Sequence, residues 1–482
     1  MAWLFPAIIV LATPAAAQSP ERENQPNIVF ILADDLGYAE LGCYGQKKIR
    51  TPHLDALAAA GMRFTQFYAG SPVCAPSRCT LLTGKHTGHT YIRGNYELGN
   101  WEQDSPEGQL PLPPDTVTLA SLLKRAGYAT AAIGKWGLGG PDSTGHPNRQ
   151  GFDFWYGYLC QRVAHNYYPT HLWRNTQKDM LPGNSWFRAH QKLAEPPRDP
   201  AGYERFRGQT YAPDRMIEEA LQFVRDHKQT PFFLYFATPV PHAAIQVPDD
   251  SLREYHGRFD KRPYLGEKGY LPHPEPRAGY AAMVTRMDRD VGRLLRLLDE
   301  LGIADNTLVL FSSDNGPTFN GGTDSAFFES AGPLRGLKAS LYEGGIRVPL
   351  IVRWPGHVAA GATSDHVGAF WDVLPTIADV AGFEVPADCD GISILPTLLG
   401  RTEAQRRHAF LYWEYAGGQA VRMGDWKAVW PKRSKAFSLY DLAHDIGETT
   451  DVSAEHPKIV EKLRTVFLSA RTPSEHFPLS RE

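Results

Sequence analysis

Four continuous apolar runs recur along the chain and constrain its fold more than any other feature. They lie at residues 27–33, 128–134, 231–237 and 307–313. Unbroken runs of this kind are typical of strands buried on both faces, as in a parallel sheet. Helical patterns separate them, at residues 51–61, 74–84, 116–126, 214–228, 279–301 and 372–381, and two further strands are predicted at 62–68 and 348–354. The alternation predicts an α/β fold with a sheet between helices.

Polar side chains stand at or shortly after the end of each run. They are Asp34 and Asp35, then Lys135, then His242, and finally Asp314 and Asn315. Open α/β sheets bind ligands outside the carboxyl ends of their strands, so these groups are predicted to meet. Paired acids repel each other unless a cation lies between them, although a solvated turn would explain Asp34-Asp35 alone equally well. An all-oxygen ligand set suits calcium or magnesium and not zinc.

Residues 71–84, Ser-Pro-Val-Cys-Ala-Pro-Ser-Arg-Cys-Thr-Leu-Leu-Thr-Gly, place a thiol at the junction of a loop and a helix. Pro76 suits a first helical turn, and Gly84 suits the end of the helix. Free backbone N–H groups at the helix start favour an anion beside Cys74, and Arg78 adds a permanent cation one turn on. For a cysteine taken alone, a half-buried structural role is the simpler interpretation.

The pattern Cys-x-Pro-Ser-Arg-x-x-x-Leu-Thr-Gly, complete at residues 74–84, resembles the signature of the type I sulfatases. The resemblance extends from about residue 27 to residue 441. It implies the alkaline-phosphatase-like fold, in which a large, mixed and mainly parallel sheet lies between helices and a smaller antiparallel sheet with a helix follows. It also implies that a formylglycine-generating enzyme oxidises Cys74 to formylglycine. The metal would be calcium, with the ligands Asp34, Asp35, Cys74, Asp314 and Asn315.

The same resemblance implies a role for each catalytic residue. Calcium and Arg78 would hold the hydrated aldehyde at position 74, which attacks sulfur. Lys135 and Lys338 would bind the sulfate oxygens, Lys338 matching a Lys-x-x-x-x-Glu-Gly-Gly segment. His242 would protonate the departing alcohol as a general acid. The implied activity is that of an arylsulfatase-like sulfuric ester hydrolase.

The chain departs from the family at Gly137. Many sulfatases read Gly-Lys-Trp-His-Leu-Gly where residues 134–139 read Gly-Lys-Trp-Gly-Leu-Gly. The family's histidine is thought to assist the hydrated aldehyde during turnover. A substitute could come from His146 or His165 in the segment that follows, and the sequence leaves both open.

The sequence gives less direct evidence for the substrate than for the reaction. Aromatic residues are dense at 151–174, where core packing explains them at least as well as sugar binding does. Polar groups cluster beside them, and Arg162 and His165 are the candidate substrate-binding residues. We expect a sulfated carbohydrate or a sulfated small molecule.

Three other interpretations stay open. A phosphonate or phosphodiester hydrolase of the same superfamily can share the cysteine motif and the acids. A secreted glycan-binding protein on an inactive scaffold would fit Gly137 but not the intact motif around Cys74. A plain thiol nucleophile or redox site at Cys74 would leave the acidic cluster unexplained.

Residues 1–17 form a short apolar run that ends in Ala-Ala-Ala, which predicts a cleaved signal peptide and not a membrane anchor. We expect an exported protein, periplasmic or secreted, with no stable membrane insertion. A catalytic domain is expected over residues 26–400. Short alternating segments after residue 408 and a helix at 456–471 predict a C-terminal α+β subdomain over 401–482.

Charge and cysteine content narrow the possible partners. The net charge of -3 gives no general attraction to nucleic acid, so any anion must be held by local cations. The 5 cysteines are scattered and odd in number, which indicates neither a disulfide framework nor a zinc ribbon. The proline-rich segment 248–276 is expected to be a surface insertion near the mouth of the site.

Overall fold

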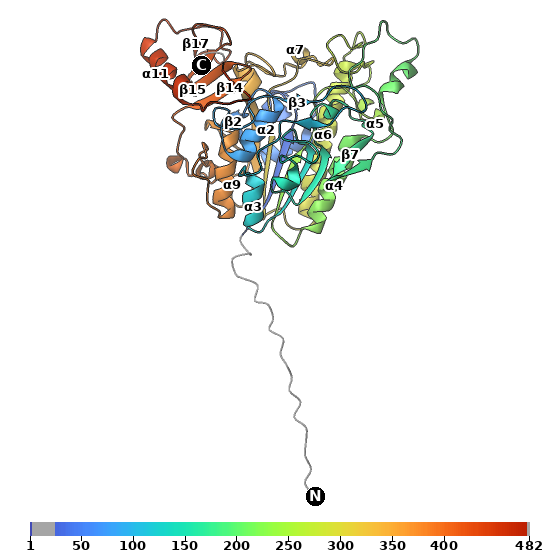
Figure 1. The fold of residues 1–482 in the computed structure, drawn as a ribbon, viewed down its shortest axis with the longest axis horizontal. Helices are drawn as coiled ribbons and strands as arrows, with labels where there is room; N and C mark the ends of the chain where they lie inside the picture. The colour runs from blue at the N-terminus through green and yellow to red at the C-terminus, as the bar shows by residue number, and fades with distance from the viewer. Residues whose placement is uncertain (2–24, 480–482) are drawn as a thin grey trace.

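In the computed structural model, which describes residue 1 and residues 25–479, a mixed sheet of 11 strands runs through the centre of the molecule (Figure 1). In order across the sheet the strands are β12 (Ala362–Ser364), β2 (Met62–Tyr68), β11 (Arg347–Arg353), β10 (Thr307–Ser313), β1 (Asn27–Ala33), β9 (Phe232–Ala237), β5 (Ala129–Lys135), β6 (Phe154–Tyr158), β7 (His171–Arg174) and β8 (Gln177–Met180), with β13 (Gly368–Ala369) beside β2. The predicted signal peptide lies outside the described residues except for Met1.

The four apolar runs form the centre of this sheet, as predicted. They are β10, β1, β9 and β5, which are neighbours in that order and all parallel. Val29 of β1 lies opposite Val309 on one side and Leu234 on the other. Because the strands are parallel and in close register, the residues that follow them gather at one end of the sheet.

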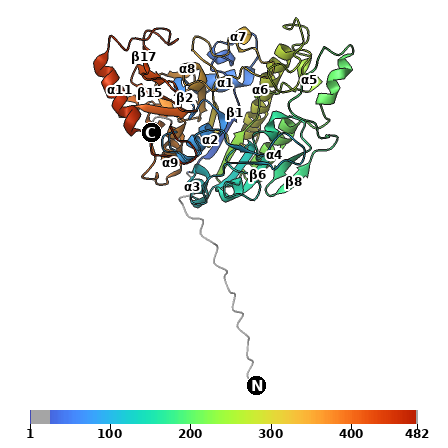
Figure 2. The ribbon, with the colours of Figure 1, turned by 45° about the horizontal axis from the view of Figure 1, so that its top comes forward.

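Alternate residues of β1 face two separate cores. Val29 and Ile31 face one core, Phe30 and Leu32 face the other, and all four are fully buried. Since successive side chains of a strand point to opposite faces, a run buried on both sides must be apolar throughout. The first core contains residues of α1 (Pro52–Ala59), α4 (Ala212–Asp226) and α6 (Pro276–Glu300), and the second contains residues of α2 (Cys74–Thr83), α3 (Leu119–Arg125) and α9 (Val373–Ala381). Figures 1 and 2 show α2, α3 and α9 on one side of the molecule and α4 and α6 on the other.

Two helices begin where a cap or a proline places them and not where the apolar pattern begins. The helix predicted from residue 116 starts at Leu119, because the Thr118 hydroxyl accepts a hydrogen bond from the Ser121 backbone N–H at 3.1 Å. The helix predicted from residue 279 starts at Pro276, a proline in the first turn.

The strands β6, β7 and β8 were not predicted. The strand β6 lies parallel to β5, and β7 and β8 follow it in antiparallel order at the edge of the sheet. Trp155, Tyr156 and Tyr158 of β6 are at most 1% exposed. The aromatic residues of this segment therefore pack mainly in the core, which was the favoured interpretation.

A small antiparallel sheet follows the large one, as predicted. It contains β14 (Leu411–Tyr415), β15 (Gly418–Met423), β16 (Trp426–Trp430) and β17 (Ser438–Asp441), and α11 (Pro457–Ser469) packs against it. The Trp413 indole N–H of β14 donates to the Ala69 carbonyl at 2.9 Å, and buried Lys427 pairs with Glu343 at 2.9 Å. These contacts join the small sheet to the loop before Cys74 and to α8 (Glu343–Ile346), which follows Lys338. The remaining short elements are β3 (Glu97–Leu98), β4 (Gly108–Gln109), α5 (Asp249–Leu252), α7 (Ser325–Phe328) and α10 (Leu395–Leu398).

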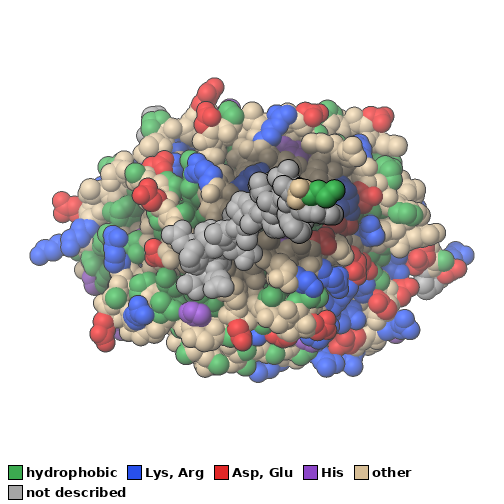
Figure 3. Space-filling view, turned by 90° about the horizontal axis from the view of Figure 1, so that it is seen from below, with side chains coloured by type: hydrophobic (Ala, Val, Ile, Leu, Met, Phe, Trp, Pro, Cys, Tyr) green, Lys and Arg blue, Asp and Glu red, His purple; other side chains and the backbone are tan. Residues whose placement is uncertain are grey.

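Charged side chains of both signs lie on the face of the molecule that Figure 3 shows. On that face basic and acidic side chains are mixed, and several basic side chains gather towards the lower right of the view. Among the described residues, no helix combines the length and the apolar character needed to cross a membrane.

Candidate active site

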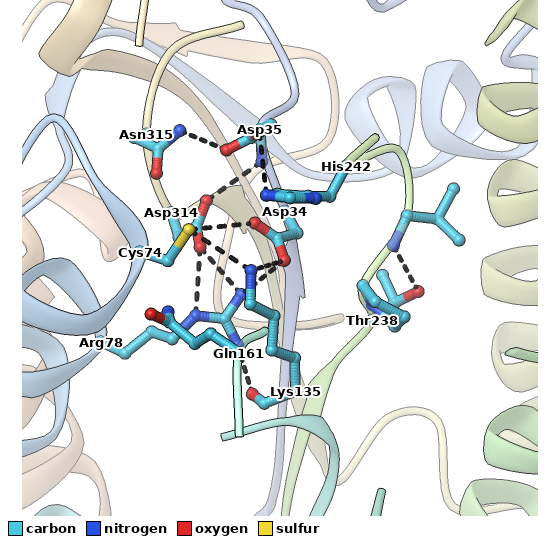
Figure 4. A network of polar contacts seen from close by, with 12 residues as sticks. Asp34, Asp35, Cys74, Arg78, Lys135, Gln161, Thr238, His242, Asp314 and Asn315 are labelled. Atoms are coloured by element: carbon cyan, nitrogen blue, oxygen red, sulfur yellow. Dashed lines mark hydrogen bonds and ion pairs between the residues drawn. The ribbon is translucent and has the colours of Figure 1, made fainter. Parts of the chain in front are cut away.

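Cys74, the first residue of α2, lies at the centre of a buried polar cluster (Figure 4). Its Sγ atom is 3.4 Å from Asp34 Oδ1 and 3.4 Å from Lys135 Nζ. Lys338 Nζ approaches the same sulfur at 3.6 Å. The structure thus brings the ends of β1 and β5 and the loop after β10 together at the start of α2.

Arg78 lies one helical turn beyond Cys74 and is fully buried. Its Nη2 is 2.8 Å from Asp314 Oδ2 and 3.5 Å from Asp34 Oδ2, and its Nε donates to Asp314 at 3.1 Å. Its Nη1 donates to the Lys135 carbonyl. The guanidinium group is therefore the counter-charge that fixes the acids, and every one of its nitrogens already has a partner within the protein.

The charges of the cluster balance. Lys135 Nζ is 2.6 Å from Asp34 Oδ2, and Lys338 Nζ is 2.7 Å from the Asp35 carboxylate. Together with Asp314 and Arg78, this makes three carboxylates and three permanent or protonated cations. A divalent cation added to such a cluster would leave a positive excess, which favours an anionic ligand.

The oxygen atoms of the cluster fit a hard divalent cation. Asn315 Nδ2 donates to Asp35 Oδ1 at 2.8 Å, whereas Asn315 Oδ1 is buried and has no hydrogen-bond partner among the described residues. Burial, together with the charge of Asp34, raises the pKa of Asp314 to about 6. An unpaired buried carbonyl oxygen and crowded carboxylates are the features that a calcium or magnesium ion would satisfy. The predicted ligands Asp34, Asp35, Asp314 and Asn315 all belong to this group.

Asp34 behaves in the opposite way to Asp314. Burial alone would raise the pKa of Asp34, but the charge of Lys135, with those of its neighbours, outweighs burial and holds that pKa well below its ordinary value. Asp34 is therefore a carboxylate at neutral pH. Its two oxygens face different partners, Oδ1 the Cys74 sulfur and Oδ2 the Lys135 ammonium group.

His242 lies beside the acids with one ring nitrogen available. Its Nδ1 contacts the Ala243 carbonyl, so the neutral ring carries its proton there, and its Nε2 is 3.6 Å from Asp35 Oδ2. Burial, together with the charges of Lys135 and Lys338, lowers the pKa of His242 to about 4. A bound anion would oppose the effect of the two lysines and favour a proton on Nε2.

His165 stacks on His242, with the ring centroids 4.9 Å apart. Its Nδ1 lies 3.1 Å from His190 Nε2, and His190 Nδ1 accepts a hydrogen bond from the Tyr270 backbone N–H at 3.1 Å. Burial lowers the pKa of His190 to about 4 and holds that of His165 well below its ordinary value, so both rings are neutral. The backbone donor therefore fixes both tautomers and leaves the proton of His165 on Nε2.

Two other residues singled out by the sequence have local partners. Arg162 donates to the Pro106 carbonyl at 2.9 Å and lies over the Trp101 ring at 5.7 Å, so it supports the loop between β3 and β4. His146 contacts the Asn175 carbonyl through Nε2 and accepts from the Asn148 backbone N–H through Nδ1. Of the two histidines that the sequence left open, only His165 lies beside His242.

The sequence indicates no role for Gln109, His190 or Tyr270, and it indicates Gln161 only as the first residue of the polar cluster that contains Arg162 and His165. Figure 4 draws the Gln161 side chain among those of the cluster around Cys74. The Tyr270 ring packs against His165 and His242, with centroids 4.9 and 5.8 Å away. Because Tyr270 belongs to the segment 248–276, the prediction that this excursion lies near the mouth of the site is confirmed. The placement of Gln109 and His190 depends on contacts that no local pattern records.

Family models match two parts of the chain. The model described as Sulfatase matches residues 26–383. The model described as N-sulphoglucosamine sulphohydrolase, C-terminal, matches residues 337–472. Together they cover both the large sheet and the small one.

Whole proteins resemble the chain over most of its length. The N-acetylgalactosamine-6-sulfatase of the dog, Canis lupus familiaris, is 32% identical over 99% of this chain and 85% of its own. The steryl-sulfatase of the mouse, Mus musculus, is 34% identical over 91% of this chain and 74% of its own. The solved structure of Ps i-CgsB in complex with k-i-k-neocarrahexaose superposes with a TM-score of 0.74 and 29% identity, and the match covers 92% of each chain.

Proposed function

The chain belongs to the sulfatase family and is a sulfuric ester hydrolase, and we propose that its substrate is a sulfate ester of a carbohydrate. The family resemblance found in the sequence is thereby confirmed. We propose that residue 74 supplies the nucleophile that releases the sulfate. The observation that supports the proposed site is the position of Cys74, whose sulfur lies between two lysines and beside the Asp34 carboxylate.

In this proposal the chain's own residues hold and protonate the substrate. Asp34, Asp35, Asp314 and Asn315, with residue 74, would hold the metal. A formylglycine at position 74 would supply a hydrated aldehyde oxygen as the nucleophile, and calcium would supply positive charge beside the sulfate. Lys135 and Lys338 bind the sulfate oxygens from two sides, since both ammonium groups already face position 74. His242 gives a proton from Nε2 to the leaving oxygen.

The environment of Cys74 argues against a plain thiolate nucleophile. Burial, reinforced by the charge of Asp34, raises the pKa of the Cys74 thiol well above its ordinary value. A thiol that stays protonated at neutral pH is a poor nucleophile and a poor metal ligand. Conversion to formylglycine removes this difficulty, because an aldehyde hydrate needs no thiolate.

A carbohydrate substrate is favoured by the relatives and by the groups around His165. The dog relative is an N-acetylgalactosamine-6-sulfatase, and Ps i-CgsB was solved with k-i-k-neocarrahexaose. Trp101 stacks on His165 with centroids 5.2 Å apart, and the Nε2 proton of His165 has no acceptor among the described residues. Aromatic faces with polar donors beside them suit sugar rings. We therefore propose His165 as a substrate contact and Arg162 as the residue that supports Trp101.

The proposal extends to the maturation of the protein and its location. We propose that the chain is exported to the periplasm or secreted after cleavage of residues 1–17. A formylglycine-generating enzyme would act on residue 74 before the chain folds, because Cys74 is 1% exposed in the folded state. Residues 26–400 would form the catalytic domain, and residues 401–482 would form the C-terminal subdomain.

Release of sulfate from defined esters tests the proposed function. The purified enzyme is offered 4-nitrophenyl sulfate, sulfated amino sugars, a steryl sulfate and an aryl phosphodiester at equal concentrations. We expect the highest kcat/KM on a sulfated sugar. Preference for the phosphodiester would favour the phosphonate or phosphodiester hydrolase alternative. Binding of sulfated sugars without release of sulfate would favour the glycan-binding alternative.

Replacing His242 with glutamine is expected to lower kcat far more for substrates with a poor leaving group than for substrates with a good one. For a sugar sulfate, whose alkoxide needs a proton, we expect kcat to fall about 10²–10⁴-fold. For 4-nitrophenyl sulfate, whose phenolate leaves unaided, the fall should be within about tenfold. The measurement is kcat on both substrates for His242→Gln and for wild type.

The histidine His146 provides the matched control for this prediction. It is 2% exposed, like His242, but its ring nitrogens contact a separate loop. His146→Gln should change kcat on both substrates by the same small factor. An equal loss on both substrates in His242→Gln would contradict the role of a general acid.

Calcium is expected to stabilise the protein through the acidic cluster. Saturating calcium at about 100 times its dissociation constant contributes roughly 2.7 kcal/mol, which should raise Tm by at least about 3 °C over the protein in EDTA. Asp314→Asn should lose this increment. The measurement is thermal unfolding of both proteins with and without calcium.

A second group of possible metal ligands provides the control. This group consists of His86, His89 and Asp390, whose ligand atoms lie close to one another, and it is separate from the group around Cys74. Asp390→Asn should keep the full calcium increment. If Asp390→Asn loses the calcium-dependent rise in Tm and Asp314→Asn keeps it, calcium binds at the second group and not at the acidic cluster around Cys74.

A further inference from the structure

Gly137 leaves space that the side chain of Gln161 fills. Its φ angle is 87°, a left-handed conformation that favours glycine. A Cβ atom at position 137 would lie 2.9 Å from Gln161 Cγ and 2.9 Å from Gln161 Nε2. The absence of a side chain at one position and the presence of a glutamine at the other are therefore parts of a single packing arrangement.

The strands β5 and β6 bring these two residues to the active site. Beyond the end of β5, the Trp136 N–H donates to the Tyr158 carbonyl at 3.0 Å and the Gly137 N–H donates to the Leu159 carbonyl at 3.2 Å. The segments that follow β5 and β6 thus continue side by side past Lys135. In the view of Figure 4, the Gln161 side chain crosses that of Arg78 and is drawn among the residues of the cluster around Cys74.

The orientation of the Gln161 amide is fixed by Gln109. The Gln161 backbone N–H donates to the side-chain oxygen of Gln109 at 2.8 Å. The other end of the same Gln109 amide, its Nε2, must then be a donor, and it lies 3.1 Å from the Gln161 side chain. The atom that it meets is therefore the oxygen Oε1. Since a backbone N–H can only donate, neither amide can be turned round without losing a hydrogen bond.

This clamp leaves Gln161 Nε2 as a buried donor with nothing to bind. Gln161 is 1% exposed, and its Nε2 has no hydrogen-bond partner within residues 25–479. A buried donor left unpaired is costly, and such groups in folded proteins are expected to meet a ligand or water. Unlike the lysines and Arg78 of the cluster, Gln161 Nε2 is thus a neutral donor, and it has no hydrogen-bond partner among the described residues.

We propose that Gln161 Nε2 donates a hydrogen bond to an oxygen of the sulfate group as it is transferred, and that Gln109 is the residue that positions it. The inference rests on the proposed function and adds a specific contact to it. An amide donor cannot take up or release a proton, so it stabilises charge on the sulfate without acting as a base. The Gln161 amide beside Gly137 would then contact the anion, whereas the histidine that many sulfatases carry at position 137 can titrate.

Gln109→Glu is the sharpest test, because it changes one atom of a residue outside the reaction. A carboxylate at position 109 accepts from the Gln161 backbone N–H but cannot donate to Oε1. The Gln161 amide should then turn over, direct Nε2 to position 109 and present an oxygen to the sulfate. We expect kcat/KM to fall about 10–10²-fold and the dissociation constant of inorganic sulfate, measured by calorimetry, to rise about tenfold.

Two further variants show whether the effect passes through Gln161. Gln161→Ala should raise the dissociation constant of inorganic sulfate by the same factor as Gln109→Glu. The double variant should bind sulfate as tightly as Gln161→Ala alone. Gln150→Glu is the control, since Gln150 is also a 1% exposed glutamine but contacts the Pro113 and Thr144 carbonyls. It should leave the affinity for sulfate unchanged. Thermal unfolding of each variant identifies any that fail to fold.

The outcomes separate this inference from the proposed function. A wild-type enzyme that releases no sulfate from any ester would overturn the proposed function itself. A wild-type enzyme that is active, combined with Gln109→Glu and Gln161→Ala variants that bind inorganic sulfate as wild type does, would overturn only the role of Gln161. Additive losses in the double variant would contradict the proposal that Gln109 acts through Gln161.

Discussion

Replacing Cys74 with alanine is expected to abolish turnover of every sulfate ester, with a fall in kcat of about 10⁵-fold or more. The change removes the precursor of the nucleophile, while Lys135, Lys338 and His242 stay in place. Because it removes only one small buried group, the free energy of unfolding should fall by no more than about 1–2 kcal/mol. Release of sulfate from 4-nitrophenyl sulfate and from a sulfated sugar, measured on folded protein, gives the result.

Cys79 provides the matched control on the same helix. It is fully buried in α2, and its Sγ is 2.9 Å from the Thr90 hydroxyl, away from the acidic cluster. Cys79→Ser should keep kcat within about threefold of wild type, since it preserves size and hydrogen bonding. Substantial turnover by Cys74→Ala would show that the nucleophile lies elsewhere in the chain.

Replacing Arg78 with methionine is expected to damage both stability and activity. The change leaves Asp314 and Asp34 buried without their shared counter-charge, and breaking a buried pair in this way costs about 3–5 kcal/mol. It also releases the Lys135 carbonyl at the end of β5. We expect kcat/KM on any sulfate ester to fall by about 10²–10³-fold or more. Denaturant unfolding and kinetics on the folded fraction measure the two effects.

Arg93 separates a loss of stability from a loss of function. It is 4% exposed and pairs with Glu414 at 3.1 Å, outside the cluster around Cys74. Arg93→Met should cost a comparable free energy of unfolding yet keep kcat/KM in the folded protein within about threefold. If Arg78→Met proved as active as Arg93→Met, Arg78 would be a structural residue only.

The centre of the fold could be predicted from the sequence because burial on both faces leaves a strong pattern. The strands β1, β5, β9 and β10 are buried on both faces, so each consists mainly of apolar residues and appears as an apolar run. The polar residues that end each run were therefore expected at one edge of the sheet. The structure brings Asp34, Lys135, His242 and Asp314 together there.

The edge of the sheet could not be predicted in the same way. The strand β8 is largely exposed and polar, and β7 is only partly buried, so neither carries a clear alternation. The start of α3 depends on a single hydroxyl, that of Thr118, which a hydrophobic pattern does not record. Such elements are determined by their neighbours and their caps and not by their own composition.

The site itself was predicted only as far as its residues belong to local motifs. Arg78 was expected beside the anion, but its guanidinium group is turned to Asp314 and to the Lys135 carbonyl. The clamp between Gln109 and Gln161 joins positions 52 residues apart, and the pair His165 and His190 joins positions 25 apart. Contacts at such separations follow from the three-dimensional fold, so a single sequence gives no signal for them.

The most direct test of the account is the mass of the peptide that carries residue 74, released by protease from protein made in the cells of its source. The account predicts a loss of mass that matches the change from the thiol-bearing methylene of cysteine to an aldehyde. That result would identify the nucleophile from which sulfate release is derived. An unmodified Cys74, in an enzyme that nevertheless hydrolyses sulfate esters, would contradict the central claim.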